Sequence, residues 1–386
     1  MYKIKTMNKI SPVGLSKVNS AKFSVADEYN DEDGIIVRSA SLHEYDMPTS
    51  LKAIARAGAG VNNIPLDACS EKGIVAFNTP GANANAVKEL VVLGLLMSSR
   101  KVFPAMNWVQ TQDVNEDVSK LVEKGKSQFT GPELTGKTLG VIGLGAIGIK
   151  VANIAVQLGM NVLGYDPYLS VDNALSLSQE VKHVITLDEV YKNADYISLH
   201  LPQTSDTKGM INSESIKSMK YGMRILNFAR AGLVNDEDMI AALEEGSVKV
   251  YVTDFPNEKL LNNSGVLAIP HLGASTPESE ENCAVMAVEQ IQEYLENGNI
   301  INSVNLPNVS MPRSGSGRLG IIHRNMPNMI AQISNAISNA NLNIENLENK
   351  SRGEYAYFLV DINGADLNAV VENISKIDGV LKVNQF

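Results

Sequence analysis

The segment TLGVIGLGAIG, residues 138–148, constrains the fold of this chain more than any other feature. Its first five residues are a short apolar run typical of a buried strand. The glycines after it have the spacing GxGxxG, and an apolar pattern ending at residues 158–159 predicts a helix with a glycine stop. A second apolar run, MNVLGYD, comes next. This order of strand, glycine turn, helix and strand predicts a βαβ unit that binds a dinucleotide.

Each glycine of this motif has a physical role. Gly143 permits the tight turn, Gly145 lets the backbone approach a pyrophosphate, and Gly148 lets the helix pack against the strand. The first turn of the helix offers free N–H groups and a positive dipole end to phosphate. Asp166 ends the second strand, where a carboxylate accepts hydrogen bonds from the adenine ribose and repels a 2′-phosphate. No arginine follows it closely, so the sequence favours NAD over NADP.

Strands and helices alternate on both sides of this motif, which indicates an α/β protein with parallel sheets. The later apolar runs are ADYISLHLP, MRILNFA and KVYVTD, and the earlier ones are GIIVRSA, LKAIARAG and GIVAFNTP. We interpret the glycine pair in ARAGAGVNN as a turn, because it lacks a third glycine. Helical patterns near residues 86–102 and 277–297 would carry the chain into the nucleotide domain and back.

We therefore expect two doubly wound sheets, with a Rossmann-type nucleotide domain inserted in a flavodoxin-like substrate domain. The substrate domain would comprise residues 1–103 and 274–304, and the nucleotide domain residues 104–273. Residues 305–317 form a Pro/Ser/Gly-rich linker. Residues 318–386 follow the order strand, helix, strand, strand, helix, strand, which is the ferredoxin-like arrangement.

Composition excludes several other classes of protein. A net charge of −10 and a pI near 5.1 argue against binding to nucleic acid. The N-terminus has no apolar stretch of the secretory type, and the most apolar run, LVVLGLLM, is too short to span a bilayer. Cys69 and Cys283 are far apart, so they predict neither a disulfide framework nor a metal site. We expect a cytoplasmic protein.

Three residues have the chemistry that oxidation of an alcohol by a nicotinamide requires. His271 can take the hydroxyl proton, because histidine titrates near neutrality. A carboxylate on the other ring nitrogen fixes the tautomer, and we assign this role to Glu258, with Glu244 and Glu245 as other acids nearby. Arg230 follows a predicted strand and can bind a substrate carboxylate through two hydrogen bonds.

The motifs NFARAGLVNDEDM, FPNE and PHLGAST, in this order after GLGAIG, resemble the D-isomer-specific 2-hydroxyacid dehydrogenases. The resemblance extends to IARAGAGVNNI, AVKELVV and HRNMP, and so to nearly the whole chain. It implies that Arg230, Glu258 and His271 are catalytic. Ala231 and Lys259 depart from the residues usual in the family. The implied NAD contacts are Gly143, Gly145, Ala146, Ile147, Gly148, Asp166, Phe228, Ala229, Arg230, Asp254, His271, Leu272, Gly273 and Ala274.

Within this family the chain is similar to short members that carry a C-terminal ACT domain. This similarity implies oxidation of D-3-phosphoglycerate to 3-phosphohydroxypyruvate, the first step of L-serine biosynthesis. It points to Arg38 and Arg56 as contacts of the substrate phosphate or carboxylate, with Asn83 and Asn85 as further hydrogen-bonding groups. The alternative for both arginines is pairing with surface acids.

The ACT resemblance also implies regulation by L-serine, bound by His323, Asn325 and Asn343 between paired domains of two chains. The protein would then be a homo-oligomer, a dimer at least and a tetramer as the larger form. We also expect Asn325 to cap the following helix, with Pro327 in its first turn.

Two other functions stay open at this stage. The chain could act on a different 2-hydroxy acid, such as glycerate, lactate or 2-hydroxyglutarate. It could also be a non-enzymatic NAD sensor that regulates transcription, although no basic region for a DNA partner is visible.

Overall fold

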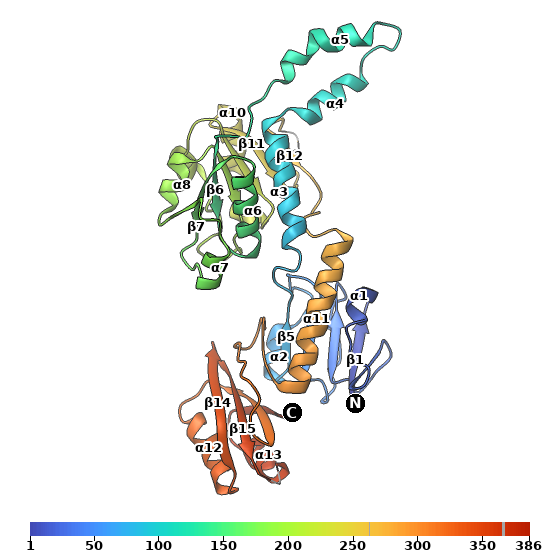
Figure 1. The fold of residues 1–386 in the computed structure, drawn as a ribbon, viewed down its shortest axis with the longest axis vertical. Helices are drawn as coiled ribbons and strands as arrows, with labels where there is room; N and C mark the ends of the chain where they lie inside the picture. Colours follow the sequence, from blue (N-terminus) through green and yellow to red (C-terminus); the bar gives the residue numbers. More distant parts are fainter. Residues whose placement is uncertain (262, 365–366) are drawn as a thin grey trace. The chain divides into compact units, whose positions relative to one another are not determined.

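The computed structural model describes residues 1–261, 263–364 and 367–386, which form two compact units (Figure 1). One unit comprises Met1–Asn83 and Pro277–Phe386, and the other comprises Ala84–Thr276. The second unit begins before the expected residue 104, because helix α3 (Ala84–Ser99) packs against helix α6 (Ala146–Gln157).

The second unit contains a parallel sheet of seven strands in the order β12-β11-β10-β9-β6-β7-β8. The bounds of these strands are β6 Thr138–Ile142, β7 Asn161–Tyr165, β8 Val181–Val184, β9 Tyr196–Leu199, β10 Met223–Asn227, β11 Val248–Thr253 and β12 Val266–Ala268. From β8 to β11 this is the strand order of the Rossmann fold. The predicted nucleotide-binding architecture and the βαβ unit at its centre are confirmed.

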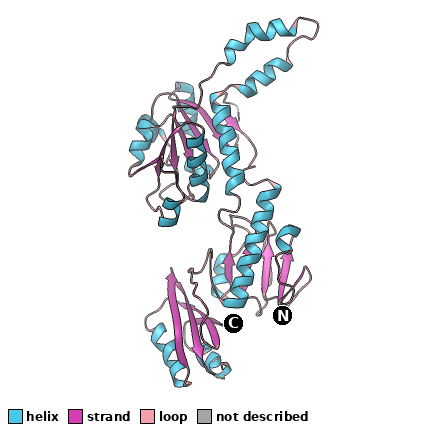
Figure 2. Cartoon of the chain, in the orientation of Figure 1, coloured by secondary structure: helices cyan, strands magenta, loops and turns pink. Residues whose placement is uncertain are grey.

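Successive side chains of the central strands point to opposite faces, and each face is covered by helices. Tyr196 and Leu226 pack with α3 and α6, whereas Ile197 and Ile225 pack with the helices of the other face. Figure 2 shows these helices around the sheet. Besides α3 and α6, the helices that follow β6 in this unit are α7 Val171–Leu175, α8 Leu187–Asn193, α9 Ser213–Lys217, η2 Ala231–Leu233 and α10 Asp236–Glu245.

An arm of two helices, α4 (Val102–Gln110) and α5 (Val118–Gly125), follows α3. Neither helix has a buried residue. The arm is closed by the short helix η1 (Lys126–Phe129), where Phe129 lies 5.4 Å from the ring of Trp108. The apolar side chains of α4 are therefore left at the surface of this chain.

The first unit contains a parallel sheet of five strands in the order β2-β1-β3-β4-β5. This is the flavodoxin-like order, so the expected type of sheet is confirmed. Helix α11, predicted near residues 277–297, packs on β3, β4 and β5. The bounds in this part are β1 Tyr2–Met7, α1 Pro12–Leu15, β2 Phe23–Ala26, β3 Gly34–Val37, β4 Ala53–Arg56, α2 Leu66–Glu71, β5 Val75–Phe77 and α11 Pro277–Asn297.

The C-terminal part of this unit is an antiparallel sheet in the order β14-β15-β13-β16. Its elements are β13 Gly317–Arg324, α12 Met329–Asn339, β14 Asn343–Arg352, β15 Tyr355–Asn363, α13 Asn368–Ser375 and β16 Val380–Gln385. The predicted order of strands and helices is confirmed.

The predicted helix cap in this part is wrong. Helix α12 begins at Met329, and the residue before it, Asn328, has a left-handed backbone with φ 68°. Asn325 lies too early in the chain to cap this helix. Its N–H donates instead to the carbonyl of Glu354. This bond ties Asn325 to the turn between β14 and β15.

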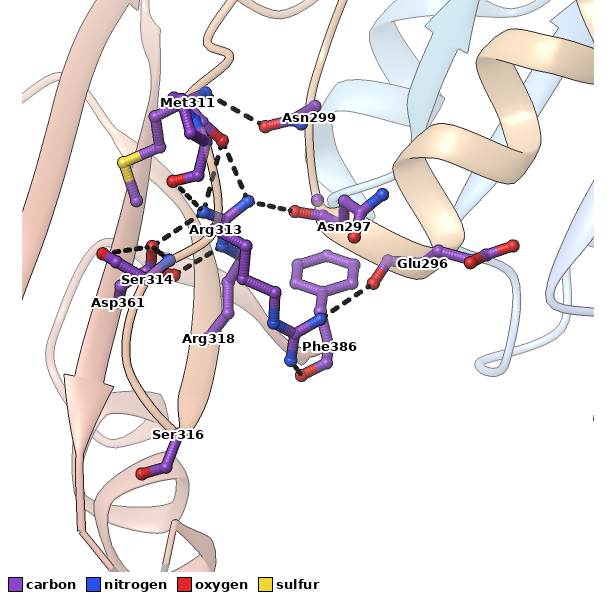
Figure 3. Close-up of polar contacts among 12 residues, drawn as sticks. Glu296, Asn297, Asn299, Met311, Arg313, Ser314, Ser316, Arg318, Asp361 and Phe386 are labelled. Atoms are coloured by element: carbon purple, nitrogen blue, oxygen red, sulfur yellow. Dashed lines mark hydrogen bonds and ion pairs between the residues drawn. The ribbon is translucent and has the colours of Figure 1, made fainter.

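A buried ion pair ties the C-terminal sheet to the segment before it (Figure 3). Arg318 donates through Nε and Nη2 to the two carboxylate oxygens of Asp361, at 2.5 and 2.7 Å. The same guanidinium donates to the carbonyls of Asn297, Met311 and Pro312. Because these groups lie on α11, the linker and two strands, one side chain joins all of them.

Among the described residues, no helix is long and apolar enough to cross a bilayer. The same part of the chain contains no group of three or more histidine, cysteine or acidic side chains that could bind a metal ion.

We predict that Arg318→Met destabilises the first unit by about 3–5 kcal/mol, because it leaves a buried carboxylate without its partner. Hydrogen exchange of the β13 and β15 amides should rise accordingly. The double variant Arg318→Met with Asp361→Leu should lose less stability than the single variant, since it removes both buried charges together. If the double variant were as unstable as the single one, the cost would come from packing.

The same pair predicts a dependence on pH. Burial alone would raise the pKa of Asp361, but the hydrogen bonds from Arg318 and Ser314 outweigh it and hold that pKa below its ordinary value. The contribution to stability is therefore complete above the ordinary aspartate pKa and is lost as pH falls through the lower folded-state value.

Candidate active site

The glycine loop lies between β6 and α6, at the carboxyl end of β6 and beside the point where the strand order reverses. Gly143 has φ +95°, and a Cβ there would come within 2.5 Å of the carbonyl of His200. A Cβ on Gly148 would lie 1.9 Å from the Gly143 carbonyl oxygen. Gly145 has open space around it, which leaves room for a ligand at the start of α6. Ala146 and Ile147 form the first turn of this helix.

Asp166 follows β7 and is held beside the glycine loop. The N–H of Leu144 donates to Asp166 Oδ2 at 2.8 Å, and the N–H of Tyr168 donates to Oδ1 at 2.9 Å. A carboxylate has about four lone-pair positions, so each oxygen can still accept a further hydrogen bond. The position and the free acceptor capacity fit a ribose bound at the predicted place.

His200, which follows β9, borders the same loop. Its N–H donates to the carbonyl of Ile142, and its ring Nε2 lies 2.9 Å from Ser198 Oγ. Burial lowers the pKa of His200 to about 3, so its ring is neutral at physiological pH. A neutral, hydrogen-bonded ring is consistent with the structural role expected for it.

Arg230 lies just after β10, in a turn organised by a buried amide. The side chain of Asn227 accepts from the N–H of Ala229 and donates to the carbonyl of Arg230. Phe228 packs into the core beside Gly94. The guanidinium of Arg230 is exposed and donates only to the carbonyl of Ala229 among the described residues.

Asp254, at the end of β11, is a buried carboxylate with one free oxygen. Its Oδ2 accepts from the N–H of Gly273 at 3.3 Å, whereas Oδ1 is buried without a hydrogen-bond partner in the described part of the chain. Burial raises the pKa of Asp254, and the positive charges of His271 and Arg230 oppose this rise. The charges of these three residues therefore act on one another.

His271 is exposed and rests on Phe255, with the two ring centroids 4.9 Å apart. Leu272 and Ala274 beside it are exposed as well. Glu258 is also exposed, and within the described residues it has no hydrogen bond or ion pair with His271. The structure thus brings together His271, Arg230 and Asp254 but does not join Glu258 to the histidine.

The expected substrate residues lie at the edge of the five-stranded sheet. Arg38 follows β3 and Arg56 ends β4, and these two strands are neighbours. Arg38 forms an ion pair with Glu280, so the alternative of pairing with an acid holds for this arginine. Asn83 ends the first segment of this unit, and the Asn85 amide donates to Glu89 in its own helix.

The expected effector residues do not meet within one chain. His323 is buried, with its ring nitrogens 2.7 Å from the Arg324 carbonyl and 3.2 Å from Asn349 Oδ1. The side chain of Asn325 donates to Gly353, at the same end of the sheet.

Asn343 lies at the other end of this sheet. His323 is opposite Ala356 on β15, whereas Asn343 is opposite Asn363 on the same strand. The exposed Asn343 amide donates to Glu345. A site that uses all three residues would need a second chain.

Sequence reasoning missed four residues that shape these sites: Asn227, Phe255, Glu280 and Asn349. Asn227 and Phe255 are the first residues of the motifs NFARAGLVNDEDM and FPNE, so membership in these motifs is the available signal for them. Glu280 and Asn349 reach their partners only through the fold.

Comparison with known proteins agrees with this geometry. Residues 92–275 match the family model described as D-isomer specific 2-hydroxyacid dehydrogenase, NAD binding domain. This part of the chain is therefore an NAD-binding domain. A solved structure of NAD⁺-bound 3-phosphoglycerate dehydrogenase from Entamoeba histolytica is 30% identical, with a TM-score of 0.60, and the match covers 79% of this chain and 98% of that one.

Two curated relatives extend the similarity. D-3-phosphoglycerate dehydrogenase of Methanocaldococcus jannaschii is 36% identical over 321 residues, which is 81% of this chain and 59% of that protein. The enzyme of the same name from Haemophilus influenzae is 32% identical over 335 residues, 84% of this chain and 78% of that protein. This chain thus spans only about three fifths of the first relative. By its sequence, its strand order and its glycine loop, the chain belongs to the D-isomer specific 2-hydroxyacid dehydrogenase family.

Proposed function

We propose that this protein oxidises D-3-phosphoglycerate to 3-phosphohydroxypyruvate with NAD, as the first step of L-serine biosynthesis. The observation that carries the proposal is that Arg230, Asp254 and His271 follow the carboxyl ends of the neighbouring strands β10, β11 and β12, where the N–H of Gly273 donates to Asp254. Ligands of open α/β sheets bind at this edge.

The residues of the second unit fit NAD. The first turn of α6 would hold the pyrophosphate and Asp166 the adenine ribose. Asp254 Oδ1 is a buried acceptor without a partner in the described chain, and the carboxamide N–H of a nicotinamide would satisfy it. When bound, NAD would accept the hydride from the substrate carbon.

The side chains of this site supply the rest of the chemistry. His271 would take the proton of the substrate hydroxyl during oxidation and return it to the carbonyl oxygen during reduction. Arg230 would hold the substrate carboxylate and stabilise negative charge on the reacting oxygen. Glu258 stays our proposed partner of His271, and this role requires that its side chain turns toward the ring.

The substrate assignment rests on charge and on the relatives. Arg38 and Arg56 lie side by side at the edge of the first sheet, which favours a substrate with a second anionic group. Another 2-hydroxy acid is the alternative. NADH formation with 3-phosphoglycerate, compared with lactate, glycerate and 2-hydroxyglutarate, tests the choice directly. Equal or faster turnover of an unphosphorylated acid would overturn it.

We further propose that the protein is a homo-oligomer. Helix α4 exposes Val102, Phe103, Met106 and Val109, each more than 40% accessible. Trp108 of this helix packs on Phe129, but these four apolar side chains stay exposed among the described residues, and such an apolar patch favours a partner in another chain. The mass of the protein in solution, measured by light scattering, tests this proposal.

We predict that His271→Ala lowers kcat by about 100- to 10,000-fold, because the proton transfer loses its acid–base group. NAD affinity, measured by calorimetry, should survive since the glycine loop is unchanged. His183→Ala is the matched control, because His183 is an exposed histidine on β8. A His271→Ala enzyme with most of its activity would remove this residue from the mechanism.

Glu258→Gln identifies the partner acid. If Glu258 stabilises the protonated ring, the acidic limb of the pH–rate profile for oxidation should move to lower pH in this variant. Glu244→Gln and Glu245→Gln should leave the profile unchanged. A profile that responds to Asp254→Asn and not to Glu258→Gln would transfer the role to Asp254.

Cofactor choice is predicted to depend on Asp166. Asp166→Ala should weaken NAD binding by about 10- to 100-fold, the effect of losing hydrogen bonds to a charged acceptor. It should also reduce discrimination against NADP, because the repulsion of a 2′-phosphate is lost. Asp172→Ala, in the exposed first turn of α7, is the control. Equal use of NADP by the wild type would contradict this assignment.

We propose that residues 318–386 form an ACT regulatory domain that binds L-serine between two chains. The antiparallel βαββαβ topology and the separation of His323 from Asn343 within one chain support this arrangement. Inhibition would require that serine binds one state of the enzyme more tightly than the other.

Asn343→Ala is predicted to weaken inhibition by L-serine, measured as the concentration that halves NADH formation. Asn346→Ala, an exposed change on the same strand, should leave the inhibition as in the wild type. His323→Ala should also weaken it, with the melting temperature recorded because this side chain is buried. A wild-type enzyme insensitive to millimolar L-serine would remove the effector role.

A further inference from the structure

The five-stranded sheet has its topological switch point between β1 and β3. Both neighbouring strands end there, β1 at Met7 and β3 at Val37, and the chain leaves in different directions. A hollow of about 320 Å³ lies just beyond, lined among others by Lys9, Arg38 and Glu280. Open parallel sheets bind ligands at this kind of position.

Two guanidinium groups lie at this edge. Val37 and Arg56 are partners in the register of β3 and β4, so Arg38 and Arg56 leave adjacent strand ends. Burial lowers the pKa of Arg56, and the charge of Arg38 lowers it further. Arg56 Nε is buried and has no hydrogen-bond partner among the residues that the structure describes. Two cations at neighbouring strand ends favour the binding of an anion between them.

An acidic side chain of the same chain already forms an ion pair with one of these two arginines. Glu280, in the first turn of α11, pairs its carboxylate with the Nη2 of Arg38. Both side chains are partly exposed, at 46% for Arg38 and 42% for Glu280. Exposed ion pairs contribute little to stability, and an acid in the first turn of a helix is favoured without any partner. Glu280 can therefore leave Arg38 at small cost.

We propose that Glu280 is an internal anion that occupies Arg38 until the phosphate group of the substrate displaces it. This proposal rests on the proposed function and names a specificity-determining residue of the substrate site. Replacing one carboxylate on Arg38 by another gains little. A phosphate group has a charge of about −1.5 to −2 and three acceptor oxygens, so it outcompetes Glu280 and can contact both arginines.

The test measures anion binding apart from turnover. Inorganic phosphate is titrated into the full-length wild type and into Glu280→Gln by calorimetry at low ionic strength. Glu280→Gln should bind phosphate about two- to fivefold more tightly, the range expected for removal of an exposed ion pair. The KM for 3-phosphoglycerate should fall by the same factor while kcat is retained.

Glu278→Gln is the matched control, because it removes the same charge from the same helical turn without lining the hollow. It should bind phosphate as the wild type does. In an Arg38→Met background, the Glu280→Gln change should bring no gain. Circular dichroism and melting temperature show whether each variant is folded.

Several results would overturn the proposal. These are equal phosphate affinity in wild type and Glu280→Gln, an equal gain in Glu278→Gln, a gain that persists without Arg38, or no phosphate binding by any of these proteins. Failure of the proposed function looks different: no 2-hydroxy acid would then be oxidised by the wild type. The phosphate titrations would still decide the role of Glu280.

Discussion

The close approach of Gly148 to Gly143 is the constraint on which the site of the second unit depends. A side chain on Gly148 would overlap the Gly143 carbonyl, so only glycine lets α6 start this near the end of β6. That contact sets the first turn of α6 beside Leu144, whose N–H holds Asp166. One packing contact therefore positions both the turn that we propose to bind phosphate and the acid that we propose to bind the ribose.

The edge of the same sheet that we propose to be catalytic holds a buried group that folding alone does not favour. Asp254 is buried, its Oδ1 has no hydrogen-bond partner in the described part of the chain, and burying a carboxylate in this way is costly. The nearby charges of His271 and Arg230 offset part of the cost. A bound nicotinamide would offset more, so the binding of NAD and the charge balance at the active site are expected to be coupled.

Both parallel sheets carry charged side chains just after the carboxyl ends of their strands, but the two sheets differ in whether these charges are paired. In the second unit, among the described residues, Asp254 Oδ1 has no hydrogen-bond partner and the Arg230 guanidinium donates only to the carbonyl of Ala229. In the first unit, Arg38 is neutralised by Glu280. Substrate binding would then be an exchange of anions at Arg38. Farther along this unit, the buried pair of Arg318 and Asp361 fixes the C-terminal sheet to α11 and the linker.

The sequence by itself determined both sheet types, the glycine loop and the order of elements in the C-terminal sheet, because these depend on local spacing of glycines and apolar residues. It also placed Asp166 correctly at the end of β7. Only the tertiary structure decided which distant groups meet: Glu280 with Arg38, Asp361 with Arg318, and Asp254 with the backbone of Gly273, two residues after His271. Likewise Asn325 is a residue type common at helix caps, yet its N–H forms a hydrogen bond with the turn between β14 and β15. Strand order and burial determine which residues become partners, because they bring together side chains that are far apart in the sequence. Such pairing leaves no periodic signal in the sequence.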